Sequence, residues 1–337
     1  MTIKTMLTGA VAAGAILTGV QGAQAAGHLE EITVAYFLEW PMPFQYAKVN
    51  EIYEEEMGVD INWVSFDTGT AMSAAMASGD VQIAVSQGVP PFVVATSAGQ
   101  DIQAVDVAVS YSDNDNCVVR TELEIDQDSA DELAGKKAAV PLGTAAHYGF
   151  LKQMEHFGVD PASMEIVDMA PAEGAAALAQ GAVDMSCGWG GGLNRMKESG
   201  NILLTGAEKE ELGILVFDVT SAPANFVAEE SELLAAFLKV TADMNERWNS
   251  GEEAQAEMLP VIAQDAGMDE EAAAASLATF TFPSASDQLG EQWLGGGAQE
   301  FMGGVAQVFV DAGSIDGALD SYDATVATGP LQTASEM

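Results

Sequence analysis

The feature that most constrains this fold is a strand, turn, helix and strand unit between residues 61 and 85. A β-branched strand is expected over Ile61–Phe66, the small-residue turn Asp67-Thr68-Gly69 follows, and Ser78-Gly79-Asp80 precedes a second strand at Val81–Val85. The first N–H groups of a helix lack intrahelical partners and the helix dipole is positive there, so this turn suits an anionic group. An ordinary strand-to-helix turn explains the same pattern, and the pattern alone favours that interpretation.

The same alternation of strands and helices continues along the chain. Strands are expected at 32–37, 61–66, 81–85, 102–109, 137–141, 165–169, 183–188 and 213–220, and helices at 45–57, 70–78, 147–157, 172–180, 231–250, 251–266 and 288–312. The polar, turn-rich segment 111–116 separates two such series. This predicts an α/β fold of two lobes with largely parallel sheets, two extended crossings and a helical C-terminal region. Ligands of such sheets bind at the carboxyl ends of the strands, here in the cleft between lobes.

The N-terminus predicts export. Residues 1–4 carry a positive charge, residues 6–20 are apolar or small, and Ala23-Gln24-Ala25 is an A-x-A cleavage site, which is typical of a signal peptide. The apolar run is shorter than the roughly 20 residues that span a bilayer. No cysteine lies at the cleavage site to carry a lipid, so we expect a free periplasmic protein. The predicted parts are a signal peptide (1–25), the N-terminal part of lobe 1 (26–110), lobe 2 (111–217), and the return to lobe 1 with the C-terminal helices (218–337).

The charge balance restricts the partners. Fifty-one acidic and eleven basic residues give a formal charge of -40, while 48% hydrophobic content supplies a core, so the chain is a folded, acidic globule. This charge excludes nucleic acid and anionic membrane surfaces as partners. A saline habitat and a plain solvation shell both explain the acidity. Any anionic ligand group must be held by local donors.

Three turns are candidate seats for such an anion. They are Thr68-Gly69-Thr70, Ser86-Gln87-Gly88 and Gly143-Thr144-Ala145, and each follows a strand and precedes a helix. A capped helix with no ligand is the alternative for each. Asp218 is expected at an interlobe crossing, where a buried carboxylate is costly without a partner, so a cationic ligand group would suit it, with the rings of Trp189 and Trp40 as walls. An Asp218 bonded to hinge backbone is the competing interpretation.

Three sequence blocks resemble the periplasmic substrate-binding proteins of taurine ABC importers and, more broadly, alkanesulfonate and nitrate binders. The blocks are Val64–Gly69 with Ala77–Ile83, Gly135–Pro141 with His147-Tyr148, and Trp189 with Asp218. The resemblance runs from about residue 32 to about residue 322. The stretch 144–148, combined with an aspartate in the return strand, resembles the taurine subgroup and implies a small zwitterion as ligand.

The resemblance implies a two-lobe periplasmic binding protein fold (type II, Venus flytrap) that delivers taurine or a related small sulfonate to a membrane permease and its ATPase. It also implies a monomer, and we expect no cofactor and no metal. The loop 37–45 is longer than is usual in the family. Its Glu39 is either a second carboxylate for an amine or a solvated loop residue. The whole predicted ligand site is Glu39, Trp40, Thr68, Gly69, Thr70, Gln87, Gly88, Thr144, Ala145, His147, Trp189 and Asp218.

Two further details of the sequence bear on these expectations. Gly190-Gly191-Gly192 replaces the more usual Ala-Pro of the family, which leaves a methylated or slightly larger ammonium sulfonate open as ligand. Cys117 and Cys187 are both placed in lobe 2, on strands that this topology makes neighbours. An oxidising periplasm favours a disulfide between them, and two buried cysteines acting as small hydrophobic residues are the alternative.

An enzyme is the competing class of function, since a thiamine-pyrimidine synthase family uses the same two-lobe fold. Of three histidines, only His147 is placed to face the cleft, and the chain has no phosphate-binding loop, nucleophile elbow or zinc spacing. We therefore expect that the protein is not an enzyme. A binder of another zwitterion, alkanesulfonate or nitrate, and a sensory periplasmic protein, stay open as alternatives.

Overall fold

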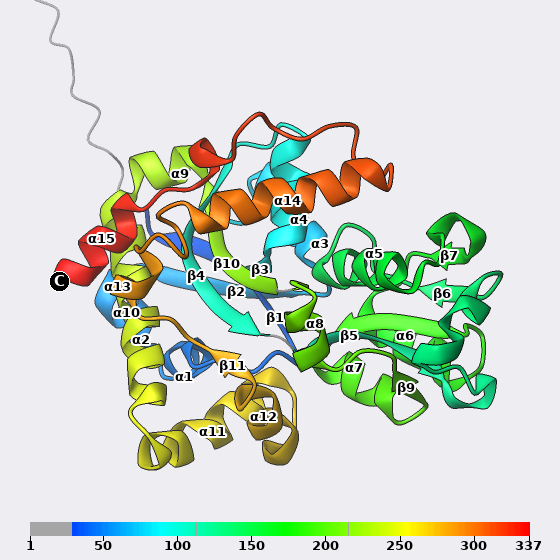
Figure 1. The fold of residues 1–337 in the computed structure, drawn as a ribbon. Coiled ribbons are helices and arrows are strands. Elements are labelled where there is room, and N and C mark those ends of the chain that lie inside the picture. The colour runs from blue at the N-terminus through cyan, green and yellow to red at the C-terminus, as the bar shows by residue number, and fades with distance from the viewer. Residues whose placement is uncertain (1–28, 112, 215) are drawn as a thin grey trace, which may run out of the picture.

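The computed structural model describes residues 29–111, 113–214 and 216–337. The predicted signal peptide lies outside these ranges. The described chain forms two α/β lobes, each built around its own mixed sheet, as Figure 1 shows. The prediction of a two-lobe α/β fold is confirmed.

The sheet of lobe 1 has six strands in the order β11-β4-β10-β3-β1-β2. Its parallel part consists of β1 (Glu31–Phe37), β2 (Asp60–Phe66) and β3 (Ile83–Gly88). The return strand β10 (Val216–Pro223) runs antiparallel between β3 and β4 (Ile102–Tyr111), and the short β11 (Phe280–Thr281) pairs with β4. The sheet is therefore less parallel than expected, because the chain comes back from lobe 2 in the opposite direction.

The sheet of lobe 2 has five strands in the order β7-β6-β8-β5-β9. The strand β6 (Lys137–Ala139) runs parallel to β7 (Glu165–Val167) and β8 (Met185–Trp189), whereas β5 (Asp115–Arg120) pairs antiparallel with β8 and with β9 (Gly200–Ile202). The β5–β8 register places Cys117 opposite Cys187, and the structure joins them in a disulfide.

Fifteen helices are present among the described residues. In lobe 2 they are α5 (Ala145–Phe157), α6 (Pro171–Ala179) and α7 (Gly190–Lys197), with α8 (Gly206–Glu211) on the way back to lobe 1. The others are α1 (Phe44–Val49), α2 (Ile52–Met57), α3 (Gly69–Ser78), α4 (Val89–Ser97), α9 (Ala224–Glu229), α10 (Ser231–Asn249), α11 (Glu252–Ala266), α12 (Glu270–Leu277), α13 (Ala285–Gln288), α14 (Gly297–Asp311) and α15 (Gly329–Glu336).

Two expected helices differ from the observed ones. The helix expected over 45–57 is divided into α1 and α2 because Glu51 takes a left-handed conformation with φ of 57°. The helix expected over 288–312 begins only at Gly297, since a series of turns occupies 289–296 and Gly296 has φ of 148°. Neither break is marked by a proline, so the helical sequence pattern continues through both.

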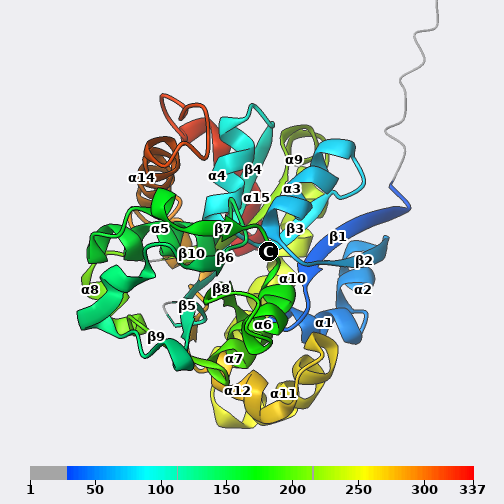
Figure 2. The same ribbon diagram turned by 90° about the vertical axis from the view of Figure 1, so that its right-hand side faces the viewer.

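The two lobes contact each other through more than the crossings. The helix α14, in the C-terminal region, packs on α4 of lobe 1 and on α5 of lobe 2. Figure 2 looks from the side of lobe 2 and shows α14 and α5 next to each other. One hydrophobic cluster spans both lobes, and a smaller one lies within lobe 2 around Val118 and Leu178. Among the described residues, no helix has the length and apolar character needed to cross a membrane.

Candidate functional site

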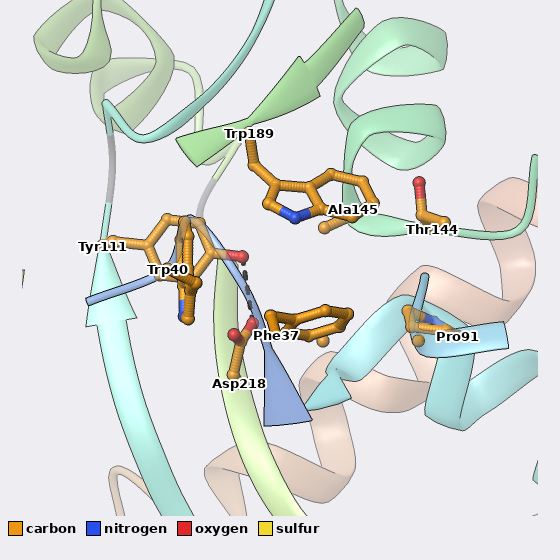
Figure 3. A pocket seen from close by; sticks show the side chains of 10 residues that line it. Phe37, Trp40, Pro91, Tyr111, Thr144, Ala145, Trp189 and Asp218 are labelled. Carbon is orange, nitrogen blue, oxygen red and sulfur yellow. Dashed lines mark hydrogen bonds between the residues drawn. The ribbon is translucent and has the colours of Figure 1, made fainter. Parts of the chain in front are cut away.

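A small cavity lies between the lobes at the carboxyl ends of β1, β3 and β8. Its volume is about 20 Å³, little more than one water molecule needs, so a larger ligand fits only after the surrounding side chains or lobes move apart. Figure 3 shows Trp189 on one side of the cavity, facing Phe37, with Tyr111 and Trp40 at one end and Thr144 at the other. The lining consists of Phe37, Trp40, Gly69, Gly88, Pro91, Tyr111, Thr144, Ala145, Trp189 and Asp218.

Asp218 is the acidic residue of this lining. It lies in β10 and is only 3% exposed. The hydroxyl of Tyr111 donates to its Oδ1 at 2.9 Å, and the hydroxyl of Ser86 donates to its Oδ2 at 2.6 Å. Both donors are neutral, and no ion pair of the described residues includes Asp218. The competing interpretation, a carboxylate held by hinge backbone, does not match these two side-chain bonds.

Burial controls the titration of this carboxyl group. The pKa of Asp218 is raised from 3.8 to about 7, mainly by loss of solvation and to a smaller extent by the nearby Asp115, against the lowering effect of its bonds from Ser86 and Tyr111. The pKa of Asp115 is itself raised by burial to about 6, with Lys209 acting in the other direction. The ammonium of Lys209 donates to the backbone carbonyl of Asp115. A cation placed beside Asp218 would stabilise its ionised form.

Aromatic rings enclose the region around Asp218. The indole N–H of Trp40 donates to Ser86 Oγ at 2.9 Å, so Trp40, Ser86 and Asp218 form one hydrogen-bonded chain. The rings of Trp40 and Tyr111 meet edge to face with centroids 5.0 Å apart, and those of Phe37 and Trp189 are 6.1 Å apart across the lobes. Ring faces next to a carboxylate provide an environment suited to an ammonium group.

The opposite end of the cavity has helix N-termini instead of charges. Thr68 caps α3 by accepting from the N–H of Ala71 at 3.2 Å, and Thr144 caps α5 by accepting from the N–H of His147 at 3.4 Å. No lining residue is Lys or Arg. An anion here would depend on backbone N–H groups and helix dipoles.

Close packing against α4 explains why residue 69 is a glycine. A Cβ added at Gly69 would lie 2.7 Å from Cγ of Pro91, so a larger residue would displace α3 or α4. The helix α4 contributes fewer donors than α3 or α5, because Pro90 and Pro91 in its first turn have no N–H. The seats at Thr68–Thr70 and Gly143–Ala145 are therefore better suited to an anion than the one at Ser86–Gly88.

Seven of the twelve residues predicted to bind ligand line the cavity. They are Trp40, Gly69, Gly88, Thr144, Ala145, Trp189 and Asp218. Thr68 and Thr70 lie next to it; their hydroxyl groups are 2.9 Å apart, and a Cβ added at Gly143 of lobe 2 would lie 3.2 Å from Cγ2 of Thr70. The side chains of the remaining three have other partners.

Gln87, His147 and Glu39 have their side chains engaged elsewhere. The Gln87 amide donates to the carbonyl of Gly69 and accepts from Ser221, so it supports the cavity lining at Gly69 without lining the cavity itself. His147 accepts from the N–H of Gly143 at 3.1 Å and stacks on Phe309, and burial lowers its pKa to about 4. The carboxylate of Glu39 binds the guanidinium of Arg195 in α7.

Three residues of the lining were absent from the predicted site: Phe37, Pro91 and Tyr111. Phe37 and Tyr111 are the last residues of β1 and β4; the sequence pattern placed Phe37 in the first strand and the loop 37–45, and Tyr111 in the polar segment 111–116. The rule that ligands bind at carboxyl ends of strands was the signal that could have identified them.

Comparisons with known proteins agree with this architecture. The model of the family described as NMT1/THI5 like matches residues 42–245. The chain is 26% identical over 304 residues to the taurine-binding periplasmic protein of Escherichia coli (strain K12), covering 89% of this chain and 92% of that protein. It is also 26% identical over 171 residues to a putative aliphatic sulfonates-binding protein of the same organism, covering 48% of this chain and 53% of that protein.

A solved structure shows the same fold. The alkanesulfonate-binding protein SsuA from Xanthomonas axonopodis pv. citri, solved with bound MOPS, superimposes with a TM-score of 0.72 at 19% identity. The match covers 89% of this chain and 98% of that one. The expectation of a periplasmic binding protein fold is confirmed.

Proposed function

We propose that this chain, which belongs to the NMT1/THI5 like family, is the substrate-binding component of an ABC importer and captures taurine or a closely related small sulfonate. In this proposal it works in the periplasm, as a monomer, after removal of its signal peptide. A permease and an ATPase of the inner membrane are its partners, and it catalyses no reaction.

The observation that carries the choice of ligand is that the buried carboxyl group of Asp218 has no cationic partner in the part of the chain that the structure describes. A buried charge costs several kcal/mol unless it is paired, and Asp218 has only neutral donors from Tyr111 and Ser86. The ammonium group of an aminosulfonate supplies the missing charge. A simple anion such as nitrate gives Asp218 no partner and would be repelled by it, so the site favours a zwitterion.

The sulfonate belongs at the other end of the cavity. Gly69, Thr144 and Ala145 line that end, at the first turns of α3 and α5. The two helices come from different lobes, so only the closed form brings both N-termini to the same group. Such a ligand stabilises the closed form by its differential affinity for it, which is how binding would shift the population.

Isothermal titration calorimetry of the mature protein tests this assignment. We expect taurine to bind, and an unsubstituted alkanesulfonate to bind at least about tenfold more weakly, because it leaves Asp218 unpaired. Hypotaurine, nitrate and a betaine complete the series. Nitrate or the alkanesulfonate binding as tightly as taurine would contradict the proposed role of Asp218. A betaine binding in place of taurine would retain the ammonium subsite and reject the sulfonate.

A further inference from the structure

The turn after β1 reaches across the cleft to lobe 2. Both carboxylate oxygens of Glu39 accept from Arg195 in α7, and the Nη2–Oε2 distance is 2.9 Å. The carbonyl of Glu39 accepts from the N–H of Gly191 at 3.2 Å. On its own side, the N–H of Glu39 donates to the carbonyl of Ala266 at 2.7 Å, which holds the turn to lobe 1. One residue is thus fastened to both lobes.

The glycines of α7 are shaped to receive this turn. A Cβ added at Gly191 would lie 2.7 Å from Cδ and 2.9 Å from Cβ of Glu39, and one added at Gly190 would lie 2.3 Å from the carbonyl oxygen of Glu39. These nearest atoms all belong to lobe 1. At Gly192, by contrast, the added atom would meet Pro171 of its own lobe. Gly190 and Gly191 therefore make room for the opposite lobe.

We propose that Glu39, Gly190, Gly191 and Arg195 form a latch that fastens the lobes in the closed form and slows the release of the ligand. Glu39 acts here through the closed conformation and not on the ligand, because its carboxylate is occupied by Arg195 and it does not line the cavity. The inference concerns how the proposed binding site is regulated, so its ligand arm rests on the proposed function. It gives Gly190 and Gly191 a physical reason.

Removing the ion pair is the first test. The side chains of Arg195 and Glu39 are 43% and 35% exposed, so Arg195→Gln or Glu39→Gln should weaken taurine binding about two- to fivefold. The change should appear as faster dissociation with an unchanged association rate, measured by stopped-flow fluorescence of the cavity tryptophans. The double exchange Glu39→Arg with Arg195→Glu should recover at least half of the loss.

A matched control lies within lobe 1. Arg247 and Glu257 form a similarly exposed pair at 2.7 Å, with both residues on lobe 1 helices. Arg247→Gln removes the same charge without affecting closure and should leave dissociation unchanged. Equal acceleration in Arg247→Gln and Arg195→Gln would mean that net charge, not the latch, governs release, and the proposal would fail.

Gly191→Ala is the sharper variant. Alanine suits a helix better than glycine, so the melting temperature should stay the same or rise, while the added methyl group obstructs Glu39 only when the lobes close. We expect dissociation at least about tenfold faster, since this clash involves the turn itself and not only its charge. Unchanged dissociation with unchanged stability would overturn the proposed docking of the turn.

Small-angle scattering of the ligand-free protein separates this proposal from the choice of ligand. Wild type should be more compact than Arg195→Gln, and Gly191→Ala should be the most open of the three. If taurine does not bind to wild type, the proposed function fails and this ordering still decides the latch. Identical scattering curves for the three proteins would refute the latch whatever the ligand.

Discussion

Two carboxylates at the cleft have opposite surroundings, although both were predicted to bind an amine. Asp218 is 3% exposed and, among the described residues, receives only neutral hydroxyl donors, from Tyr111 and Ser86. The side chain of Glu39 is 35% exposed and has its own cation in Arg195. The first is a buried charge without a counter-charge, and the second is an exposed charge already neutralised.

This difference separates recognition from closure. Burial makes an unpaired charge costly, so a cationic ligand group recovers much free energy at Asp218. An exposed ion pair contributes little, and the pair of Glu39 contributes only when the lobes meet. A carboxylate in a cleft is therefore assigned by its burial and by what already pairs with it, and not by its position in the cleft alone.

The largest effect is expected at Asp218. Asp218→Asn keeps the shape of the side chain and removes the charge, so taurine binding should weaken roughly thirtyfold or more, as when one partner of a buried charge pair is lost. The ligand-free protein should melt at a higher temperature at pH 8, because an uncompensated buried charge is gone. Calorimetry and thermal unfolding measure the two effects.

Asp106 is a matched control for that variant. It is another buried lobe 1 carboxylate, 3% exposed, that accepts from the N–H of Thr220 and does not line the cavity. Asp106→Asn should leave the preference for taurine over an alkanesulfonate intact. If both variants lost that preference, Asp218 would have no special role in recognition, and its burial would not distinguish it from Glu39.

The titration of Asp218 gives the next effect. Its pKa is raised to about 7, so below that pH the free site is protonated and a cation must displace the proton. Taurine affinity should fall as pH decreases from 8 to 5, approaching tenfold per pH unit below about pH 6, and binding at pH 7 should release roughly half a proton. Calorimetry in buffers of different ionisation enthalpy measures that release.

The stability of the ligand-free protein should respond with the opposite sign. A carboxyl whose pKa is raised on folding contributes stability below its unfolded pKa, near 3.8, and this contribution is lost as pH rises through about 7. Asp115, with its pKa raised to about 6, adds to the same trend. The two residues can be separated by the pH dependence of taurine affinity between pH 6.5 and 8. Asp115→Asn should leave this dependence in place, whereas Asp218→Asn should abolish it.

Tyr111→Phe is expected to have an intermediate effect. It removes the 2.9 Å bond to Asp218 while keeping the ring against Trp40. A hydrogen bond to a charged group contributes about 1.5–3 kcal/mol, so taurine should bind about tenfold more weakly and the pH profile should shift upward. A loss without that shift would indicate a contact with the ring and not support of the carboxylate.

The sequence predicted the lobes better than it predicted the cavity. Alternating β-branched strands and helices determine the lobes, and a lone aspartate in the return strand marked Asp218. Tyr111 was missed because its role depends on β10 lying beside β4, which is a tertiary pairing. Glu39 was offered as an amine partner because Arg195, 156 residues away, is invisible as its neighbour in sequence.

The smallest expected effect distinguishes the two carboxylates by salt. Screening at 1 M salt acts over about 3 Å and weakens exposed pairs much more than buried ones. Dissociation of taurine from wild type should therefore accelerate about two- to threefold between 0.05 and 1 M salt, and the acceleration should be lost in Arg195→Gln, whose latch has no ion pair left to screen. Potassium chloride and a larger monovalent salt should act alike, since the effect depends on ionic strength. If Arg195→Gln kept the full salt dependence, the sensitive charge would lie at the ligand itself, and the division between a buried recognition site and an exposed latch would have to be redrawn.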